Sequence, residues 1–140
     1  NMKQKYNYQY ENTCVLFYRG NDKSTEMELP KYESYLEKGR ELQNQNPNIN
    51  FFIQSDEAEF IDEMKNKFPN STVFWDEIRN IKRSNNTVDQ VYRNLNPISS
   101  KYFLAIMYMM SKCKYVICGK GNCSFWITMF RRNCENVIQV

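Results

Sequence analysis

The sequence contains no histidine, and this absence bears directly on how its five cysteines are interpreted. Cys113, Cys118 and Cys123 recur every five residues, but no two cysteines have the close pairing of a zinc knuckle. We therefore expect the cysteines to be small, mostly buried apolar residues, and we expect no metal site. Cysteines used in this way favour a reducing compartment, so a cytoplasmic location is the preferred expectation.

Long apolar runs are also missing. No run approaches the roughly 20 residues that a membrane-spanning helix needs, and no signal peptide is visible. The formal net charge is +3, and the basic residues are scattered along the chain without the basic stripe that nucleic-acid binding favours. We expect a soluble protein with no membrane span and no nucleic-acid partner.

The composition is that of a folded chain. The 140 residues are 41% apolar and 15% aromatic, which is enough to build one hydrophobic core. Residues 1–12 are polar and tyrosine-rich without a period, so they are expected to be a lead-in or linker. Residues 13–140 are expected to form a single domain.

Apolar runs and helical spacings alternate along this domain. Strands are predicted at 14–18, 49–54, 72–75, 115–118 and 136–140, of which 14–18 and 115–118 are expected to be buried. Helices are predicted at about 30–42, 57–68, 102–110 and 123–132. The helix from Tyr102 to Met110 is apolar on every side, which predicts burial over most of its surface. The polar stretch 76–97 is expected to be a long loop between regular elements, of the kind that is often functional or mobile.

The order of these elements predicts the fold class. Strands alternate with helices throughout, and no tight hairpin signal is present. This pattern is typical of an α/β domain with three layers, in which helices cover both faces of a doubly wound parallel sheet. We therefore predict a Rossmann-like fold.

Three of the predicted strands end in polar residues. The first strand is followed by Arg19, Asn21, Asp22 and Lys23, the second by Ser55, Asp56 and Glu57, and the fourth by Lys120, Gly121, Asn122, Cys123 and Ser124. In parallel sheets of this class ligands bind at the carboxyl ends of the strands. Arginine beside a helix N-terminus opened by glycine suits a diphosphate, because the guanidinium brings two parallel donors and the helix brings free N–H groups.

A carboxylate on the neighbouring strand end would accept a hydrogen bond from a base or a ribose, and Asp56 stands there. Each residue also has a structural interpretation when taken singly. Asp56 and Glu57 would cap the next helix, Arg19 would form a surface ion pair, and Gly121 would make a turn. Their joint placement on three strand ends favours the ligand site.

Three segments resemble the nucleotide-binding half of the inverting GT-B fucosyltransferases, the α1,2 and α1,6 enzymes. The run Phe17–Lys23 is similar to the family's His-x-Arg-Arg-Gly-Asp motif, and Phe51–Glu57 to its apolar strand followed by Ser/Thr-Asp-Asp. The third segment, Met110–Trp126, is similar to a serine, a cysteine, a buried strand, small polar residues and Ser-Trp-Trp. Phe17 replaces the motif's histidine, Gly20 its second arginine, and Gly119–Asn122 the usual Ala-Asn-Ser-Ser.

The resemblance implies one half of a GT-B fold, binding GDP-fucose for inverting transfer to a glycan hydroxyl without a metal or other cofactor. It implies that Arg19 and Asn122–Ser124 neutralise the leaving diphosphate, that Asp22 orients Arg19, and that Asp56 reads the guanine or the ribose. The catalytic candidates are thus Arg19 and Asp22. The nucleotide-binding candidates are Arg19, Asn21, Ser55, Asp56, Lys120, Gly121, Asn122, Cys123 and Ser124.

Nothing in the chain resembles an acceptor site, so the resemblance also implies an acceptor-binding domain that this chain does not contain. Two alternatives stay open. The first is a non-catalytic binding or assembly module, which the missing histidine and second arginine support. The second is a transferase for another nucleotide sugar.

Overall fold

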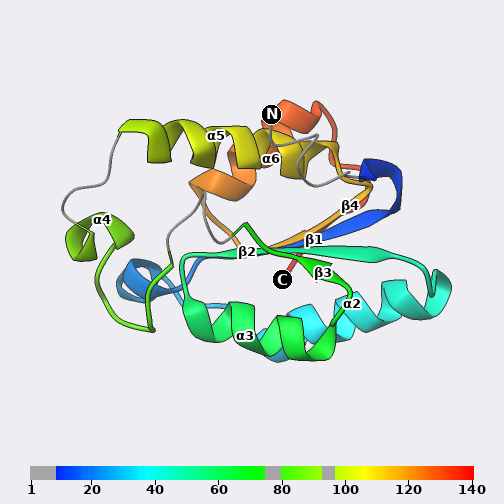
Figure 1. The fold of residues 1–140 in the computed structure, drawn as a ribbon, viewed down its shortest axis with the longest axis horizontal. Coiled ribbons are helices and arrows are strands. Elements are labelled where there is room, and N and C mark those ends of the chain that lie inside the picture. The colour runs from blue at the N-terminus through cyan, green and yellow to red at the C-terminus, as the bar shows by residue number, and fades with distance from the viewer. Residues whose placement is uncertain (1–8, 75–79, 93–96) are drawn as a thin grey trace.

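An all-parallel sheet forms the middle layer of the protein (Figure 1). The computed structural model describes residues 9–74, 80–92 and 97–140. Within these residues the sheet has five strands: β1 Thr13–Tyr18, β2 Asn50–Ser55, β3 Ser71–Thr72, β4 Tyr115–Cys118 and β5 Val137–Gln139. Their order is β3-β2-β1-β4-β5, and every pairing is parallel. The predicted parallel α/β sheet is confirmed.

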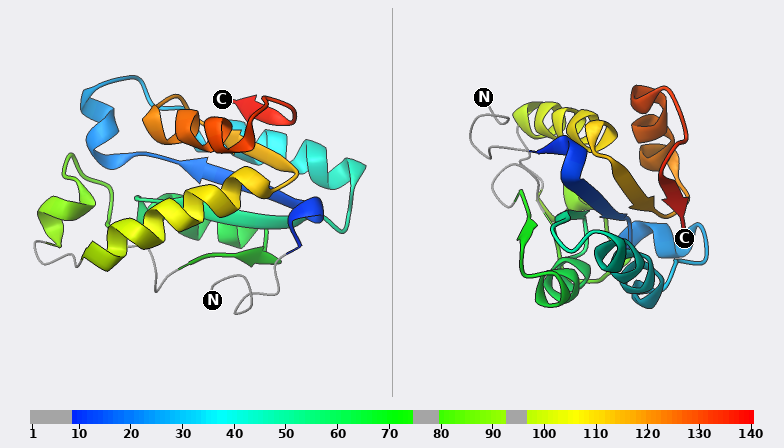
Figure 2. Two further views of the ribbon diagram at one scale, coloured as in Figure 1. Left: turned by 90° about the horizontal axis from the view of Figure 1, so that it is seen from above. Right: turned by 90° about the vertical axis from the view of Figure 1, so that its right-hand side faces the viewer.

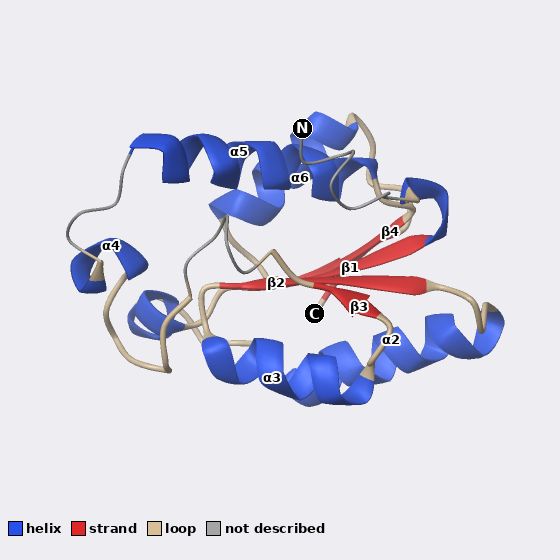
Figure 3. Ribbon diagram, viewed as in Figure 1, coloured by secondary structure: helices blue, strands red, loops and turns tan. Residues whose placement is uncertain are grey.

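Helices cover both faces of the sheet, as predicted. Helices α2 (Tyr32–Gln45) and α3 (Ala58–Lys67) lie on one face, and α5 (Pro97–Lys112) and α6 (Asn122–Arg131) lie on the other (Figure 3). Shorter elements are the 3-10 turns η1 (Tyr10–Asn12) and η2 (Asn21–Thr25) and the one-turn helix α4 (Val88–Val91). The fold is therefore a three-layer, Rossmann-like domain.

The alternation of side chains along β1 explains the two cores. Leu16 and Tyr18 point into the core beneath α2 and α3, while Val15 and Phe17 point into the core beneath α5 and α6. All six residues of β1 are buried, as expected for a central parallel strand covered on both faces. The continuous apolar run in the sequence is thus a consequence of position at the centre of the sheet.

The prediction that the helix over residues 102–110 is buried on most of its surface is wrong. Leu104 and Tyr108 of α5 are each 52% exposed, whereas Ile106 and Met110 are fully buried. A helix in an outer layer contacts the sheet along one face only, so its remaining apolar residues stay in solvent. The same holds for α6, where Phe125 is 60% exposed.

Some element boundaries differ from the predicted ones. Strand β3 covers only Ser71–Thr72, and the predicted end of this strand at Trp75 lies outside the described residues. The helix that was expected to stop at Met110 continues to Lys112. Within the polar stretch 76–97, Thr87 caps α4, because its hydroxyl accepts from the backbone N–H of Gln90 while the Gln90 side chain accepts from the N–H of Thr87.

Candidate functional site

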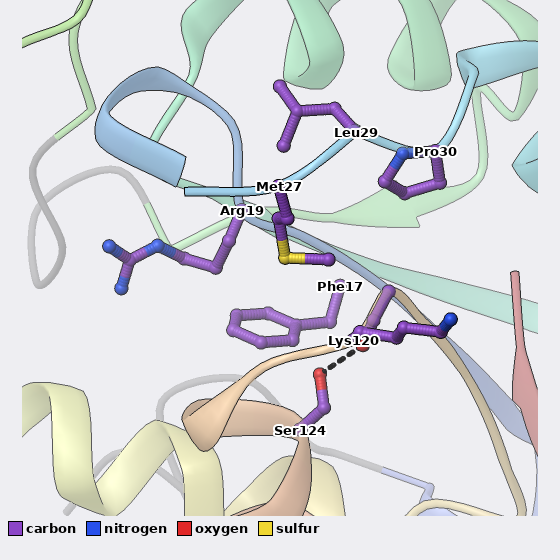
Figure 4. Close-up of a pocket in the computed structure, with 8 residues that line it drawn as sticks. Phe17, Arg19, Met27, Leu29, Pro30, Lys120 and Ser124 are labelled. Atoms are coloured by element: carbon purple, nitrogen blue, oxygen red, sulfur yellow. Dashed lines mark hydrogen bonds between the residues drawn. The ribbon is translucent and has the colours of Figure 1, made fainter. Parts of the chain in front are cut away.

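A pocket lies at the point where the strand order changes direction, between β1 and β4. Chain connections leave these two neighbouring strands toward opposite faces of the sheet, which opens a crevice at their carboxyl ends. The pocket is shallow, opens to solvent, and is lined by Phe17, Arg19, Met27, Leu29, Pro30, Gly119, Lys120 and Ser124 (Figure 4). The described lining residues include two cations and no acid. Such a pocket suits an anionic ligand with an apolar portion.

The N-terminus of α6 forms one wall of this pocket. Gly121 is the N-cap residue, no side chain caps the helix, and its first turn contains no acidic residue. The backbone N–H groups of the first turn therefore lack helical acceptors and carry the positive end of the helix dipole. The hydroxyl of Ser124 donates to the carbonyl oxygen of Gly119 at 2.7 Å, which ties the helix start to the end of β4.

Two glycines shape the turn between β4 and α6. Gly121 has φ 142°, a conformation that side chains rarely adopt, and open space surrounds its missing Cβ. A Cβ on Gly119 would lie 3.1 Å from Cγ of Pro30, so glycine there lets the loop after η2 approach the end of β4 closely. The turn is therefore open to a ligand at Gly121 and closely packed against Pro30 at Gly119.

Arg19 is held in place by neighbours on three elements. Its Nε donates to Asp56 Oδ2 at 3.1 Å and its Nη2 donates to Asp22 Oδ1 at 3.2 Å. Its Nη1 donates to the Cys123 sulfur at 3.7 Å, which links β1 to the first turn of α6. Burial opposes the charge of Arg19, but the attraction of Asp56, Cys123 and Asp22 raises its pKa above the ordinary value. Arg19 is thus a fixed cation beside the pocket.

Asp22 accepts a hydrogen bond from Arg19, the contact that its expected orienting role needs, whereas Asp56, expected to read a base or a ribose, is bonded inside the protein. Asp56 Oδ1 accepts from the backbone N–H of Gly20 at 2.9 Å, and Oδ2 accepts from Arg19. Both carboxylate oxygens therefore have partners inside the protein, and Asp56 is only 8% exposed. Its geometry is that of a residue that shapes the turn after β1 and positions Arg19.

The predicted capping of α3 by Asp56 and Glu57 is wrong. Glu57 occupies the N-cap position, but no side chain caps the helix. The Glu57 carboxylate is fully buried and accepts from the Tyr32 hydroxyl and from Arg83 Nε, the latter at 3.0 Å. A buried carboxylate is stabilised more by this cation and hydroxyl than by the helix end, so it turns away from α3.

Asn21 and Ser55 are buried and bonded away from the pocket. The Asn21 amide donates to the Asp56 carbonyl oxygen at 2.8 Å, and its Oδ1 accepts from the N–H of Ser84 at 2.9 Å. The Ser55 hydroxyl accepts from the N–H of Glu57 at 2.9 Å. These two residues hold the loops at the strand ends together, and neither belongs to the pocket lining.

The fourth strand end contributes residues to the pocket more directly. Lys120 and Ser124 line it, while Asn122 and Cys123 lie in the first turn of α6 beside it. In Figure 4 the ammonium group of Lys120 and the guanidinium group of Arg19 extend to opposite sides, with the Met27 and Phe17 side chains between them. The structure thus brings Arg19, Lys120 and the α6 N-terminus around one opening.

Two groups of residues were missed by the sequence prediction. Met27, Leu29 and Pro30 form an apolar wall of the pocket. The sequence could have indicated these three residues, since they are apolar, follow a polar loop and precede the helical pattern of α2. The second group is Arg83 and Ser84, which contact Glu57 and Asn21 from a distant polar segment that carries no such signal.

The described residues contain no group of three or more cysteines and carboxylates that would hold a metal ion. Cys14, Cys113 and Cys118 are buried, as expected for small apolar residues, whereas Cys134 is exposed. No helix in the described part of the chain is long and apolar enough to cross a bilayer.

The chain matches no protein-family model, and a search of curated proteins gives no match. The fold and pocket together define a Rossmann-like α/β domain with a cationic opening at its β1/β4 edge. The resemblance to fucosyltransferases stays a prediction.

Proposed function

We propose that this chain binds the diphosphate of a nucleotide sugar at the β1/β4 edge and is the donor-binding half of a glycosyltransferase. The observation that supports this most strongly is that Arg19, Lys120 and the uncapped α6 N-terminus all border one pocket at the strand-order switch. Each of these groups stabilises a bound anion, and the described lining residues include no acid to oppose it.

The proposed diphosphate would contact backbone N–H groups of Asn122–Ser124 and the outer edge of Arg19. Arginine has five N–H donors, and three of them have described partners, which leaves one on Nη1 and one on Nη2. Asp22 and Asp56 fix the guanidinium before a ligand arrives, so little reorganisation accompanies binding. Charge that grows on a departing diphosphate would be stabilised by these preorganised groups.

GDP-fucose is the donor that the motif resemblance implies. Two of the resembling segments, Phe17–Lys23 and Phe51–Glu57, coincide with the carboxyl ends of the adjacent strands β1 and β2. The apolar wall of Met27, Leu29 and Pro30 offers a surface for the flat face of a base or for the carbon face of a sugar. With both oxygens of Asp56 already bonded, we place the nucleoside against this wall.

A non-catalytic nucleotide-binding module is the second candidate, and one observation favours it. Asp22 and Asp56 are the carboxylates nearest the site, and both hold Arg19. None of the described pocket-lining residues is a carboxylate or a histidine, the groups that most often serve as general base for a hydroxyl. In the transferase proposal this base, or the group that replaces it, belongs to an acceptor-binding domain.

A thermal-shift screen tests the proposed ligand class. GDP, UDP, CMP, GDP-fucose and inorganic pyrophosphate would each be added to the wild type and to Lys120→Ala. We expect GDP and GDP-fucose to raise the melting temperature. Lys120→Ala should lower the affinity for these ligands severalfold, as loss of an exposed charge contact does, so the same ligand concentration should give a smaller rise. Lys114→Ala is the matched control, since Lys114 is an exposed lysine just before β4 and Lys120 follows it. If no phosphate compound stabilises the wild type, or if Lys114→Ala loses as much as Lys120→Ala, the proposal is wrong.

A further inference from the structure

Large apolar side chains lie in solvent on the outer surface of α5 and α6. Leu104 and Tyr108 on α5 are each 52% exposed, and on α6 Phe125, Trp126 and Met129 are 60%, 51% and 54% exposed. We call this surface the α5–α6 face and define it by Lys101, Leu104, Tyr108, Lys112, Phe125, Trp126, Met129 and Arg132. It is separate from the pocket lining described above.

Ring contacts join the two helices into one continuous surface. The Tyr108 and Phe130 ring centroids are 6.0 Å apart, those of Phe130 and Trp126 are 5.9 Å apart, and those of Trp126 and Phe125 are 6.3 Å apart. Figure 2 shows α5 and α6 side by side on the same face of the sheet. The aromatic residues therefore form a single patch and not two separate stripes.

Basic residues follow the same helical stripes as the apolar ones. Lys101, Leu104, Tyr108 and Lys112 recur at spacings of three and four residues, which places them along one side of α5. The Lys112 ammonium nitrogen lies 4.7 Å from the centre of the Tyr108 ring. Directly after α6, the exposed C-cap residue Arg132 adds a third cation at the end of this helix. The patch is thus bordered by cations.

Charge is distributed unevenly along the chain. Residues 97–134 contain six basic residues and no acidic one, whereas the rest of the sequence has 13 basic and 16 acidic residues. The basic residues that look scattered in the sequence therefore include a group that the fold gathers around α5, β4 and α6. Lys101, Lys112 and Arg132 are exposed, and none of the described ion pairs involves them.

Three kinds of partner could bind the α5–α6 face, and its combination of exposed apolar side chains with bordering cations favours one of them. A second copy docked by two-fold symmetry would bring like charges together. A nucleic acid would gain nothing from the aliphatic Leu104 and Met129, which cannot stack on bases. An anionic bilayer surface offers acyl chains for apolar side chains, a polar interface for Trp and Tyr, and phosphates for cations. We propose that the α5–α6 face docks the protein onto the surface of an anionic lipid bilayer.

Vesicle sedimentation tests this proposal. The wild type would be mixed with vesicles of phosphatidylcholine alone and with vesicles that contain phosphatidylserine. We expect binding only to the anionic vesicles, weakened by added salt. The double variant Phe125→Ser/Trp126→Ser should weaken the partition coefficient at least about tenfold, because two aromatic anchors are lost. Lys101→Glu/Lys112→Glu should abolish the preference for anionic lipid.

Matched controls separate docking by this face from general attraction by net charge. Lys65→Glu/Lys67→Glu changes the net charge equally, but these exposed residues lie on α3 in the opposite layer. Val91→Ser removes an apolar side chain that is 49% exposed on α4. Both variants should bind anionic vesicles like the wild type.

Three outcomes would overturn the proposal. The first is no binding of the wild type to anionic vesicles, and the second is an equal loss in the α3 variant. The third is a concentration-dependent dimer or a single-stranded RNA complex, without vesicle binding, that the Phe125→Ser/Trp126→Ser change removes. Circular dichroism would confirm that each variant is folded.

Discussion

Arg19 stands between two carboxylates and the proposed ligand, so its replacement is the sharpest test at the scale of a single residue. Arg19→Ala should weaken GDP binding by about 10- to 100-fold, because a charge-assisted hydrogen bond contributes about 1.5–3 kcal/mol. Arg19→Lys should lose nearly as much, since an ammonium group cannot make the two parallel bonds of a guanidinium. Isothermal titration calorimetry measures both.

Lys23→Ala is the control for Arg19, because Lys23 lies in the same loop but its ammonium group is paired with Glu26 at 2.7 Å. Its GDP affinity should match that of the wild type. Circular dichroism is needed for Arg19→Ala, since that change leaves the mostly buried Asp56 without its cation. Unchanged affinity in a folded Arg19→Ala protein would remove Arg19 from the site.

The buried Tyr18 hydroxyl should make the fold less stable as the pH rises into the alkaline range. Burial, and then the nearby Glu57 charge, raises the pKa of Tyr18 from 10.0 to about 12. The folded protein therefore keeps the Tyr18 proton where the unfolded chain has lost it. This contribution is complete below pH 10 and is lost as the pH rises from 10 to about 12. Urea denaturation across this range should show a smaller decline for Tyr18→Phe than for the wild type.

Tyr102→Phe is the matched control for Tyr18→Phe, because Tyr102 is 40% exposed on α5. Its pH profile should coincide with that of the wild type. Burial also raises the pKa of Tyr35, so Tyr18→Phe should reduce the alkaline decline without removing it. A Tyr18→Phe profile identical to that of the wild type would contradict the assignment.

At the scale of an element, the segment from Ile81 to Asn85 is fastened to the carboxyl ends of β1 and β2. The Ile81 carbonyl oxygen accepts from Ala58 at 2.8 Å, and the Ile81 N–H donates to the Asp56 carbonyl oxygen at 2.9 Å. The Ser24 hydroxyl donates to Asn85 Oδ1 at 3.1 Å. These bonds connect a distant polar segment to the loop that carries Arg19, so this segment supports the site without lining it.

Loss of Arg83 should loosen this connection. Arg83 Nη2 lies 2.9 Å from the fully buried Glu57 carboxylate, and Arg83→Met would leave that carboxylate without its cation. Because the Arg83 side chain is 61% exposed, we expect a modest loss of about 1–3 kcal/mol in the free energy of unfolding. Urea denaturation measures it, with the exposed neighbour Lys82→Met as control. A second change, Glu57→Gln, should recover part of the loss, and two additive losses would contradict the pairing.

The elements differ in how well the sequence predicts them. Strands β1, β2 and β4 were predicted to within about one residue, because central parallel strands are continuous apolar runs. Burial of α5 was predicted wrongly, since a run that is apolar on every side does not reveal which face meets the sheet. Residues such as Leu104 carry the same apolar signal whether they contact the core or solvent.

At the scale of the whole molecule, the residues of the site come from segments far apart in the sequence. Arg19 and Ser124 share one pocket because β1 and β4 are neighbours. Alternation of strands and helices predicts a parallel sheet, but it does not predict which strands are adjacent. The bonded states of Asp56 and Asn21 were not predictable. They depend on Gly20 and Ser84, whose positions relative to these side chains only the folded loops determine.

The chain as a whole should bind nucleotide but not transfer sugar by itself. GDP at about 100 times its dissociation constant should stabilise the fold by about 2.7 kcal/mol, because the ligand binds only the folded state. For a chain of this size that corresponds to a rise in melting temperature of roughly 5–10 °C. With GDP-fucose and an oligosaccharide, release of GDP should be no faster than in buffer. Enzyme-like transfer by the isolated chain would contradict the proposal that it is a donor-binding half.

Titration of ¹⁵N-labelled protein with GDP, followed by amide NMR spectra, tests the central claim most directly. If the diphosphate binds at the β1/β4 edge, saturable shifts should appear at Gly119–Phe125, at Arg19 and at Met27–Leu29. Residues of α3 and the amino ends of the strands should not shift. The claim would be contradicted by saturable shifts confined to another part of the molecule, or by no saturable shift at millimolar GDP.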